Sequence, residues 1–196
     1  MRKILRNILK NHLALSTVIT TLIILVVSVL LAGVVTYFAI NVVSTRVQQE
    51  SLQVSDQHVW VDAAGTAQAA FMITNTGGRD VVINQIQVRG QSATIGSSGN
   101  VYYAVANTTD TLPSALSPVA VASLATTKPF TTGNDLAKPS SSQLVLASGG
   151  TMVVYITGPD SVTINDVGLT IGLNVFTAQA MYYQETNVQA TTTTLG

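Results

Sequence analysis

A long run without charge constrains this chain more than any other feature of its sequence. No charged side chain occurs between Leu13 and Thr45, and Leu15–Val43 is almost wholly apolar or small. As an α-helix, about thirty such residues reach roughly 45 Å, whereas the hydrocarbon core of a bilayer is ~30 Å thick. A core helix of a globular domain rarely needs so long an uncharged run. The sequence therefore predicts a single membrane-spanning helix.

The charged residues are distributed unevenly about this run. Basic residues and no acid precede it, whereas all 9 acidic residues follow it. Because basic flanks stay on the cytoplasmic side of a membrane, we expect the N-terminus in the cytoplasm and the C-terminal part outside the cell. A removable secretory signal has an apolar stretch of only about 7–15 residues, about half the length of this run, so we do not expect classical removal of a signal peptide. The basic leader contains Arg2, Lys3, Arg6 and Lys10.

Small residues follow one face of the predicted helix. Ser28, Ala32 and Thr36 are spaced four apart, and Gly33 lies beside them. Such spacing lets two helices approach closely, which favours packing against other copies, although small residues are also common in any membrane helix. No Gly or Pro follows Gly33 as far as Leu52, so we expect the helix to continue beyond the membrane to Leu52.

The start of the apolar run is similar to that of a known family. A basic leader followed by Ala14 and then by Leu15-Ser16-Thr17-Val18-Ile19 resembles the N-terminal segment of archaeal type IV pilins and archaellins. The resemblance implies a class III signal peptide that a membrane-embedded prepilin peptidase cleaves between Ala14 and Leu15. It also implies that a pilus assembly machinery gathers the mature helices into a filament core. Ile73–Val88 resembles the strand–turn–strand segments of many archaeal surface β-domains.

Beyond Leu52 the sequence changes to the pattern of strands, rich in β-branched and aromatic residues. Asn75-Thr-Gly-Gly supplies a turn. Regularly spaced strands predict an antiparallel, immunoglobulin-like β-sandwich. The fold class is then α+β, with a cytoplasmic leader at 1–14, a transmembrane or assembly helix at 15–52 and an extracellular domain at 53–196. We expect strands at His58–Asp62, Ala69–Asn75, Asp80–Val88, Val101–Ala106, Gln143–Ala147, Met152–Thr157, Val167–Val175 and Ala178–Val188.

The outer domain also contains segments that are expected to lie outside its core. Thr108–Ser142, rich in Ser, Thr and Pro, is expected to be an elaborated loop with one or two short strands, most exposed over Lys128–Ser142. It would serve either as a contact surface between subunits or as an insertion. The polar tail Thr191–Gly196 is expected to fray. The residues expected to anchor the core are Trp60, Phe71, Tyr155 and Phe176.

The side chains that carry chemistry do not form a catalytic pattern. The absence of Cys excludes disulfides and thiol catalysis, and His12 and His58 are expected on opposite sides of the membrane. No Gly-x-Ser-x-Gly elbow and no phosphate-binding glycine loop occurs. Asp160, Asn165 and Asp166 could bind a hard cation, but turn formation explains them more simply. We therefore predict no enzyme activity, no cofactor and no metal site.

Two functions remain, and both concern the cell surface. The first is a structural subunit of an archaeal type IV pilus-like or archaellum-like filament, polymerising with copies of itself or with related pilins. The alternative is a monomeric, membrane-anchored surface module that binds a partner. Nucleic-acid binding has no support, because the outer domain lacks a basic patch. The sole Asn-x-Ser/Thr sequon, at Asn107, predicts a glycoprotein. Cell adhesion, motility and secretion are all compatible with the sequence.

Overall fold

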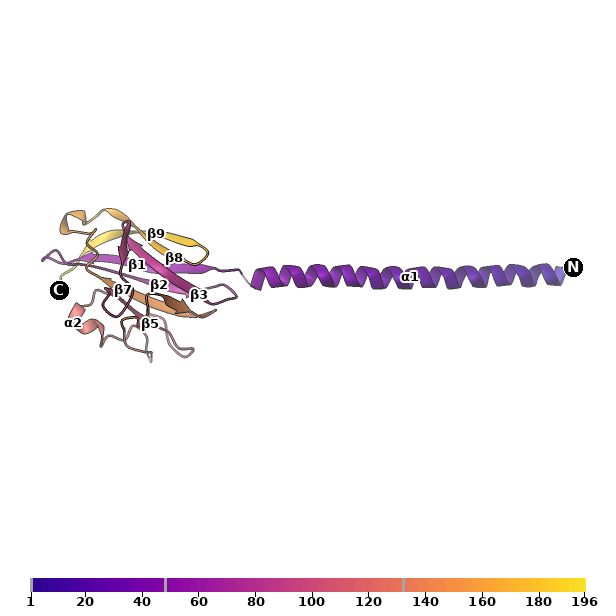
Figure 1. Ribbon diagram of the computed structural model, residues 1–196, viewed down its shortest axis with the longest axis horizontal. Helices are drawn as coiled ribbons and strands as arrows, with labels where there is room; N and C mark the ends of the chain where they lie inside the picture. The colour runs from indigo at the N-terminus through magenta and orange to yellow at the C-terminus, as the bar shows by residue number, and fades with distance from the viewer. Residues whose placement is uncertain (1, 48, 132) are drawn as a thin grey trace. The chain divides into compact units, whose positions relative to one another are not determined.

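The computed structural model describes the backbone of residues 2–47, 49–131 and 133–196, and the side chains of residues 15–45, 49–131 and 133–196. It divides into two compact units, Met1–Arg46 and Val47–Gly196. The first unit is one helix, α1, which covers Arg2–Val47 (Figure 1). The second unit is rich in strands. The chain is therefore an α+β protein with one long apolar helix followed by a β-domain.

The helix ends earlier than the sequence pattern suggested. α1 ends at Val47, and β1 (Leu52–Val61) already begins at Leu52, the residue expected to end the helix. Pairing with the β-domain outweighs helix propensity here. Ser51 accepts backbone hydrogen bonds from Thr76 at 2.9 Å and Gly77 at 3.1 Å. A Cβ at position 77 would lie 2.7 Å from the carbonyl oxygen of Gln49, so only glycine fits this crossing.

Nine strands form one hydrogen-bonded sheet in the described part of the β-domain. Their order is β4-β3-β8-β9-β1-β2-β7-β5, and β6 pairs with β3. All pairs are antiparallel except β1 with β9, which is parallel. After β1 come β2 (Ala67–Asn75), β3 (Val81–Val88), β4 (Gln91–Ala93), β5 (Val101–Val105), α2 (Val121–Leu124), β6 (Leu144–Leu146), β7 (Thr151–Thr157), the 3-10 helix η1 (Ile164–Asp166), β8 (Thr170–Thr177) and β9 (Met181–Ala190).

The main hydrophobic core draws on both halves of this sheet. Side chains of β4, β3, β8 and β9 and those of β1, β2, β7 and β5 bury into or pack against one cluster, so the sheet curls over it. The alternation is clear in β2, where Phe71 and Ile73 are fully buried in this cluster while Ala70 lies on the opposite face. Such an interior is close-packed, and loss of buried volume in it is costly.

A second core covers the outer face of β1, β2, β7 and β5. Thr108–Ser142 supplies most of its cover, and α2 lies beside β5 and β7, away from β8 and β9 (Figure 1). The segment expected to be an elaborated loop thus buries four of its large apolar side chains, while Leu112 is exposed. As a result, β7 is buried on both faces over Thr151–Ile156. The cover consists of Leu116, Leu124, Phe130, Leu136 and the C-terminal Leu195.

Two further sequence expectations are corrected by the structure. The tail Thr191–Gly196 does not fray over its whole length, because Leu195 is fully buried and its carbonyl accepts a hydrogen bond from Val121 N at 3.0 Å. Phe176 is only half-buried, because it lies on the outer face of β8, opposite the buried Val175. The other three anchors, Trp60, Phe71 and Tyr155, are confirmed as buried.

Candidate functional site

The apolar surface of α1 is the largest candidate site. Leu15–Thr45 is long and apolar enough to cross a membrane, with a mean hydropathy of 3.0. None of it is buried by the described part of the chain, and its large side chains are exposed by 45% at Val26 to 71% at Tyr37. Soluble monomers rarely expose apolar patches beyond a few hundred Å². By length and composition, the helix therefore meets the requirements of a membrane anchor or of a signal sequence.

Five hydroxyl groups on this helix donate to carbonyls of its own backbone. Ser28 donates to the carbonyl of Ile24 at 2.7 Å, and Thr36 donates to that of Ala32 at 2.7 Å. Bonds of this kind remove the cost of placing a hydroxyl in apolar surroundings. The helix can therefore enter lipid or a packed bundle without an unpaired donor at these positions. Thr20, Thr21 and Thr45 bond in the same way to Ser16, Val18 and Asn41.

The structure places the predicted packing residues on one helical face. Ser28, Ala32 and Thr36 succeed one another at one-turn intervals within α1, and Gly33 lies next to them. A Cβ at Gly33 would meet nothing within 4 Å. We call these four residues the packing stripe. Because Ser28 and Thr36 turn their hydroxyls to the backbone, the surface of the stripe is flat and these hydroxyls are hydrogen-bonded. A second helix can approach it closely.

The predicted leader forms the first turns of the same helix. The backbones of Arg2, Lys3, Arg6 and Lys10 belong to α1, while their side chains and that of Ala14 lie outside the described residues. The peptide bond between Ala14 and Leu15 is also helical. A peptidase that binds an extended chain would first have to unwind this turn.

His58 belongs to a structural cluster at an irregularity in β1. Its ring stacks on Trp60, with ring centres 5.2 Å apart, and its Nε2 lies 3.1 Å from Asp56 Oδ1. Asp56 has a φ of 51°, and its Oδ2 accepts a hydrogen bond from Leu116 N at 2.6 Å. Burial, more than any other cause, raises the pKa of neighbouring Tyr155 to about 12. The cluster thus ties β1 to the segment that covers the second core.

Asp160 and Asp166 bind different partners in the structure, Asp160 contacting Gln91 and Asp166 contacting Thr163 and Arg89. The carboxylate of Asp166 accepts hydrogen bonds from Thr163 N and Oγ1 at 2.8 and 2.9 Å and pairs with Arg89 at 2.8 Å. These bonds, chiefly those from Thr163, hold the pKa of Asp166 below its usual value. Its oxygens therefore stabilise a loop. Among the described residues, no group of three or more His, Asp or Glu side chains is placed to hold a metal ion.

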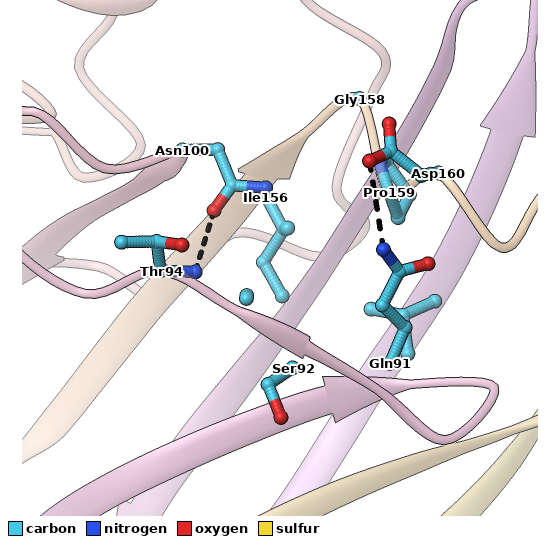
Figure 2. A pocket seen from close by; sticks show the side chains of 10 residues that line it. Gln91, Ser92, Thr94, Asn100, Ile156, Gly158, Pro159 and Asp160 are labelled. Carbon is cyan, nitrogen blue, oxygen red and sulfur yellow. Dashed lines mark hydrogen bonds between the residues drawn. The ribbon is translucent and has the colours of Figure 1, made fainter.

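A small cavity lies between the β3–β4 hairpin and the loop that follows β7 (Figure 2). Gln91 Nε2 reaches Asp160 Oδ2 at 3.5 Å on one side, and Asn100 Oδ1 accepts a hydrogen bond from Thr94 N at 2.8 Å on the other (Figure 2). Its volume of about 140 Å³ is well below the several hundred Å³ of a typical ligand pocket. We therefore interpret the cavity as a packing gap between the two loops and not as a ligand pocket.

The sequon residue Asn107 stands on an exposed turn. Its backbone N–H donates to Asp110 Oδ2 at 2.7 Å, and Asp110 N donates to the carbonyl of Asn107 at 3.1 Å. A glycosyltransferase needs such access to the asparagine amide. Glycosylation at Asn107 stays a prediction.

One structural carboxylate escaped the sequence analysis. Asp62 is buried and accepts backbone hydrogen bonds from Ala64, Thr66 and Leu195, the last at 2.9 Å. The bond from Leu195 is the main cause that lowers the pKa of Asp62. The turn residues around Asp62 are visible in the sequence as Asp-Ala-Ala-Gly. The hydrogen bond between Asp62 and Leu195, which lies 133 positions away, is not visible in the sequence.

No protein-family model matches this chain, and no curated protein matches it.

Proposed function

We propose that this chain is a structural subunit of an archaeal type IV pilus-like or archaellum-like surface filament. The observation that carries the proposal is the uncovered apolar surface of Leu15–Thr45. At 1.5 Å per residue its 31 residues span about 46 Å, some 15 Å more than a bilayer core requires. The excess length and the stripe at Ser28, Ala32, Gly33 and Thr36 suit a helix that packs beside copies of itself.

The proposed assembly proceeds in two steps. Before processing, the chain spans the cell membrane once, with its basic leader in the cytoplasm and the β-domain outside. A prepilin peptidase then cleaves between Ala14 and Leu15, which removes the four positive charges that oppose withdrawal of the helix from the cytoplasmic face. The assembly machinery transfers the mature helix into the filament core, where apolar side chains exchange lipid for other helices.

In this proposal the β-domain forms the outer sheath of the filament. We assign it to the immunoglobulin-like β-sandwiches, with the main cluster as the space between two layers and the glycan on Asn107 on its surface. The shared burial of Ile83 on β3 and Phe71 on β2 supports this assignment. An experimentally determined structure would test it through the connectivity of the two layers.

The second candidate is a surface-binding module that remains anchored in the membrane. It is favoured by the residues before the proposed cleavage point, where Asn11-His12-Leu13 stands in place of a basic residue and Lys10 is the nearest charge. If the peptidase fails to recognise this leader, α1 stays a permanent anchor and the β-domain acts alone.

Mass spectrometry of the N-terminus in sheared surface filaments and in membranes tests the proposal. We expect filaments to contain chains that begin at Leu15. Ala14→Trp should block cleavage and leave the chain in the membrane, while Leu13→Met serves as a matched control. Surface filaments without this polypeptide, together with membranes that hold it uncleaved, would overturn the proposal in favour of the anchored module.

The packing stripe is tested by two substitutions on opposite sides of α1. Ala32→Phe places a large ring on the stripe, whereas Val34→Phe places the same ring on the far side of the helix. We expect the first substitution to reduce filament yield much more than the second, with equal amounts of processed chain. Equal yields from the two variants would show that the stripe is not a contact.

A further inference from the structure

One face of the β-domain is left open by the described residues. It is the outer face of β4, β3, β8 and β9, opposite the main core. The strand register aligns Gln87 with Ser92 and with Asn174, and Asn174 with Tyr183. A row of polar side chains and one aromatic ring therefore crosses four neighbouring strands. Phe176 and Met181 form a parallel, more apolar pair beside it.

Tyr183 is fixed as a platform on this face. A Cβ at Gly172 on β8 would lie 2.5 Å from Cε2 of Tyr183 and 3.0 Å from its hydroxyl oxygen. The ring therefore occupies the space that any other residue at 172 would fill. Its hydroxyl donates to Glu185 Oε1 at 2.8 Å, which fixes the far end of the side chain. The residue is nevertheless 51% exposed.

We propose that this face binds a neutral oligosaccharide that lies across the strands, with Tyr183 stacked on one sugar ring. Gln87 and Ser92 lie in the same row and bond to each other, Gln87 Nε2 donating to Ser92 Oγ at 3.5 Å. Asn174 stands between Gln87 and Tyr183 with its Oδ1 buried. The remaining hydrogen-bonding capacity of Gln87 and Ser92 and the Asn174 amide nitrogen serve the next sugar units. This binding site goes beyond the proposed filament role and does not depend on it.

The dimensions of the row suit a short glycan. Strands lie about 4.8 Å apart, so the row from Ser92 to Tyr183 spans roughly 14 Å, and a pyranose unit in an extended chain advances by a similar ~5 Å. An aromatic ring offers its face to the C–H groups of a sugar at a small entropic cost, because it has few rotatable bonds. Contact with Gly172 and Glu185 reduces that cost further by preorganising Tyr183.

The chemistry of the face argues against other partners. β3, β4, β8 and β9 contain no Lys or Arg, and Glu185 lies beside Tyr183. A polyanion such as a nucleic acid would therefore meet no cation and one carboxylate. Strand addition is blocked on β8, because β8 pairs with β3 on one side and with β9 on the other. The amide-rich row also lacks the apolar centre of a typical protein interface.

Calorimetric titration of the full chain in lipid nanodiscs tests the inference. The probes are four neutral trisaccharides, namely cellotriose, maltotriose, mannotriose and tri-N-acetylchitotriose. We expect at least one of them to bind. Tyr183→Ala should weaken its affinity roughly tenfold, whereas Tyr183→Phe, which keeps the ring, should change it by about threefold or less.

Gly172→Ala provides a second variant that does not touch the ligand. The new Cβ displaces the ring of Tyr183 but no backbone atom, so the fold should persist while the affinity falls several-fold. Leu112→Ala, an exposed apolar residue outside this face, is the matched control and should leave binding unchanged. Absence of binding by all four sugars, or equal binding by wild type and Tyr183→Ala, overturns the proposal. A Tyr183→Ala defect in filament yield with no change in sugar binding would instead assign this face to contacts between copies.

Discussion

The two outer faces of the β-domain differ in what covers them. The outer face of β1, β2, β7 and β5 lies under residues 106–142 and the C-terminal tail, whereas the outer face of β4, β3, β8 and β9 lies open. Their side chains differ accordingly. The covered face presents Ala70, Val153 and Tyr155, while the open one presents Gln87, Asn174 and several exposed residues of β9. The side chains on the outer face of each half of the sheet are thus apolar where the chain covers that face and mostly polar where it does not.

The comparison also separates stability from function. Residues on the covered face are anchored by burial, so we expect substitutions there to unfold the domain. Residues on the open face are exposed and contribute little to stability, so we expect substitutions there to change ligand binding alone. The single tryptophan, Trp60, is buried in the second core and reports its integrity by fluorescence.

The largest expected effect is that of Phe130→Ala. Phe130 is 2% exposed and belongs to the cover of the second core. Its loss should leave a cavity and lower the free energy of unfolding by about 3–5 kcal/mol. Urea unfolding of the full chain in detergent, followed by Trp60 emission, measures this. A change below about 1 kcal/mol would mean that residues 106–142 do not pack as described.

Leu195→Ala should have the next largest effect. The substitution keeps the backbone N–H that bonds to Asp62 but removes a fully buried side chain. Because the tail can partly relax, we expect a loss of about 2–3 kcal/mol. Leu112→Ala, whose side chain is exposed, is the control in the same unfolding assay. Equal stability of the two variants would show that the tail is not part of the core.

The stability of the β-domain should depend on pH through Asp62. Its pKa is lowered in the folded protein, mainly by the N–H of Leu195, so its stabilisation is present above the unfolded pKa near 3.8 and disappears as pH falls through the lower folded value. Asp62→Asn should therefore lower the melting temperature at neutral pH, and its difference from wild type should shrink below pH 4. A constant difference across this range would contradict the assignment.

Several parts of this fold could be predicted from sequence because their signals are local. The uncharged run indicated α1, and the β-branched segments Ala69–Asn75 and Met152–Thr157 indicated β2 and β7. The predicted end of α1 was wrong because Leu52 belongs to a strand, where it pairs with Asn75, a residue distant in sequence.

The second core and the open face could not be predicted for the same physical reason. Leu116, Leu124 and Phe130 are scattered through a polar segment without helix or strand period, so nothing local marks them as buried. The position of Tyr183 over Gly172 depends on the register between β8 and β9. By contrast, the apolar surface of α1 required no long-range information.

The smallest expected effect is that of Met181→Ser on the open face. Met181 is 56% exposed, so its replacement should change the free energy of unfolding by no more than about 0.5 kcal/mol. Val153→Ser is the matched substitution at an outward position of the covered face, where Val153 is fully buried. The same assay should show Val153→Ser to be the more destabilising by at least about 2 kcal/mol, because it also buries a hydroxyl. A marked loss for Met181→Ser would mean that another molecule covers the open face, since a side chain in water contributes little to stability.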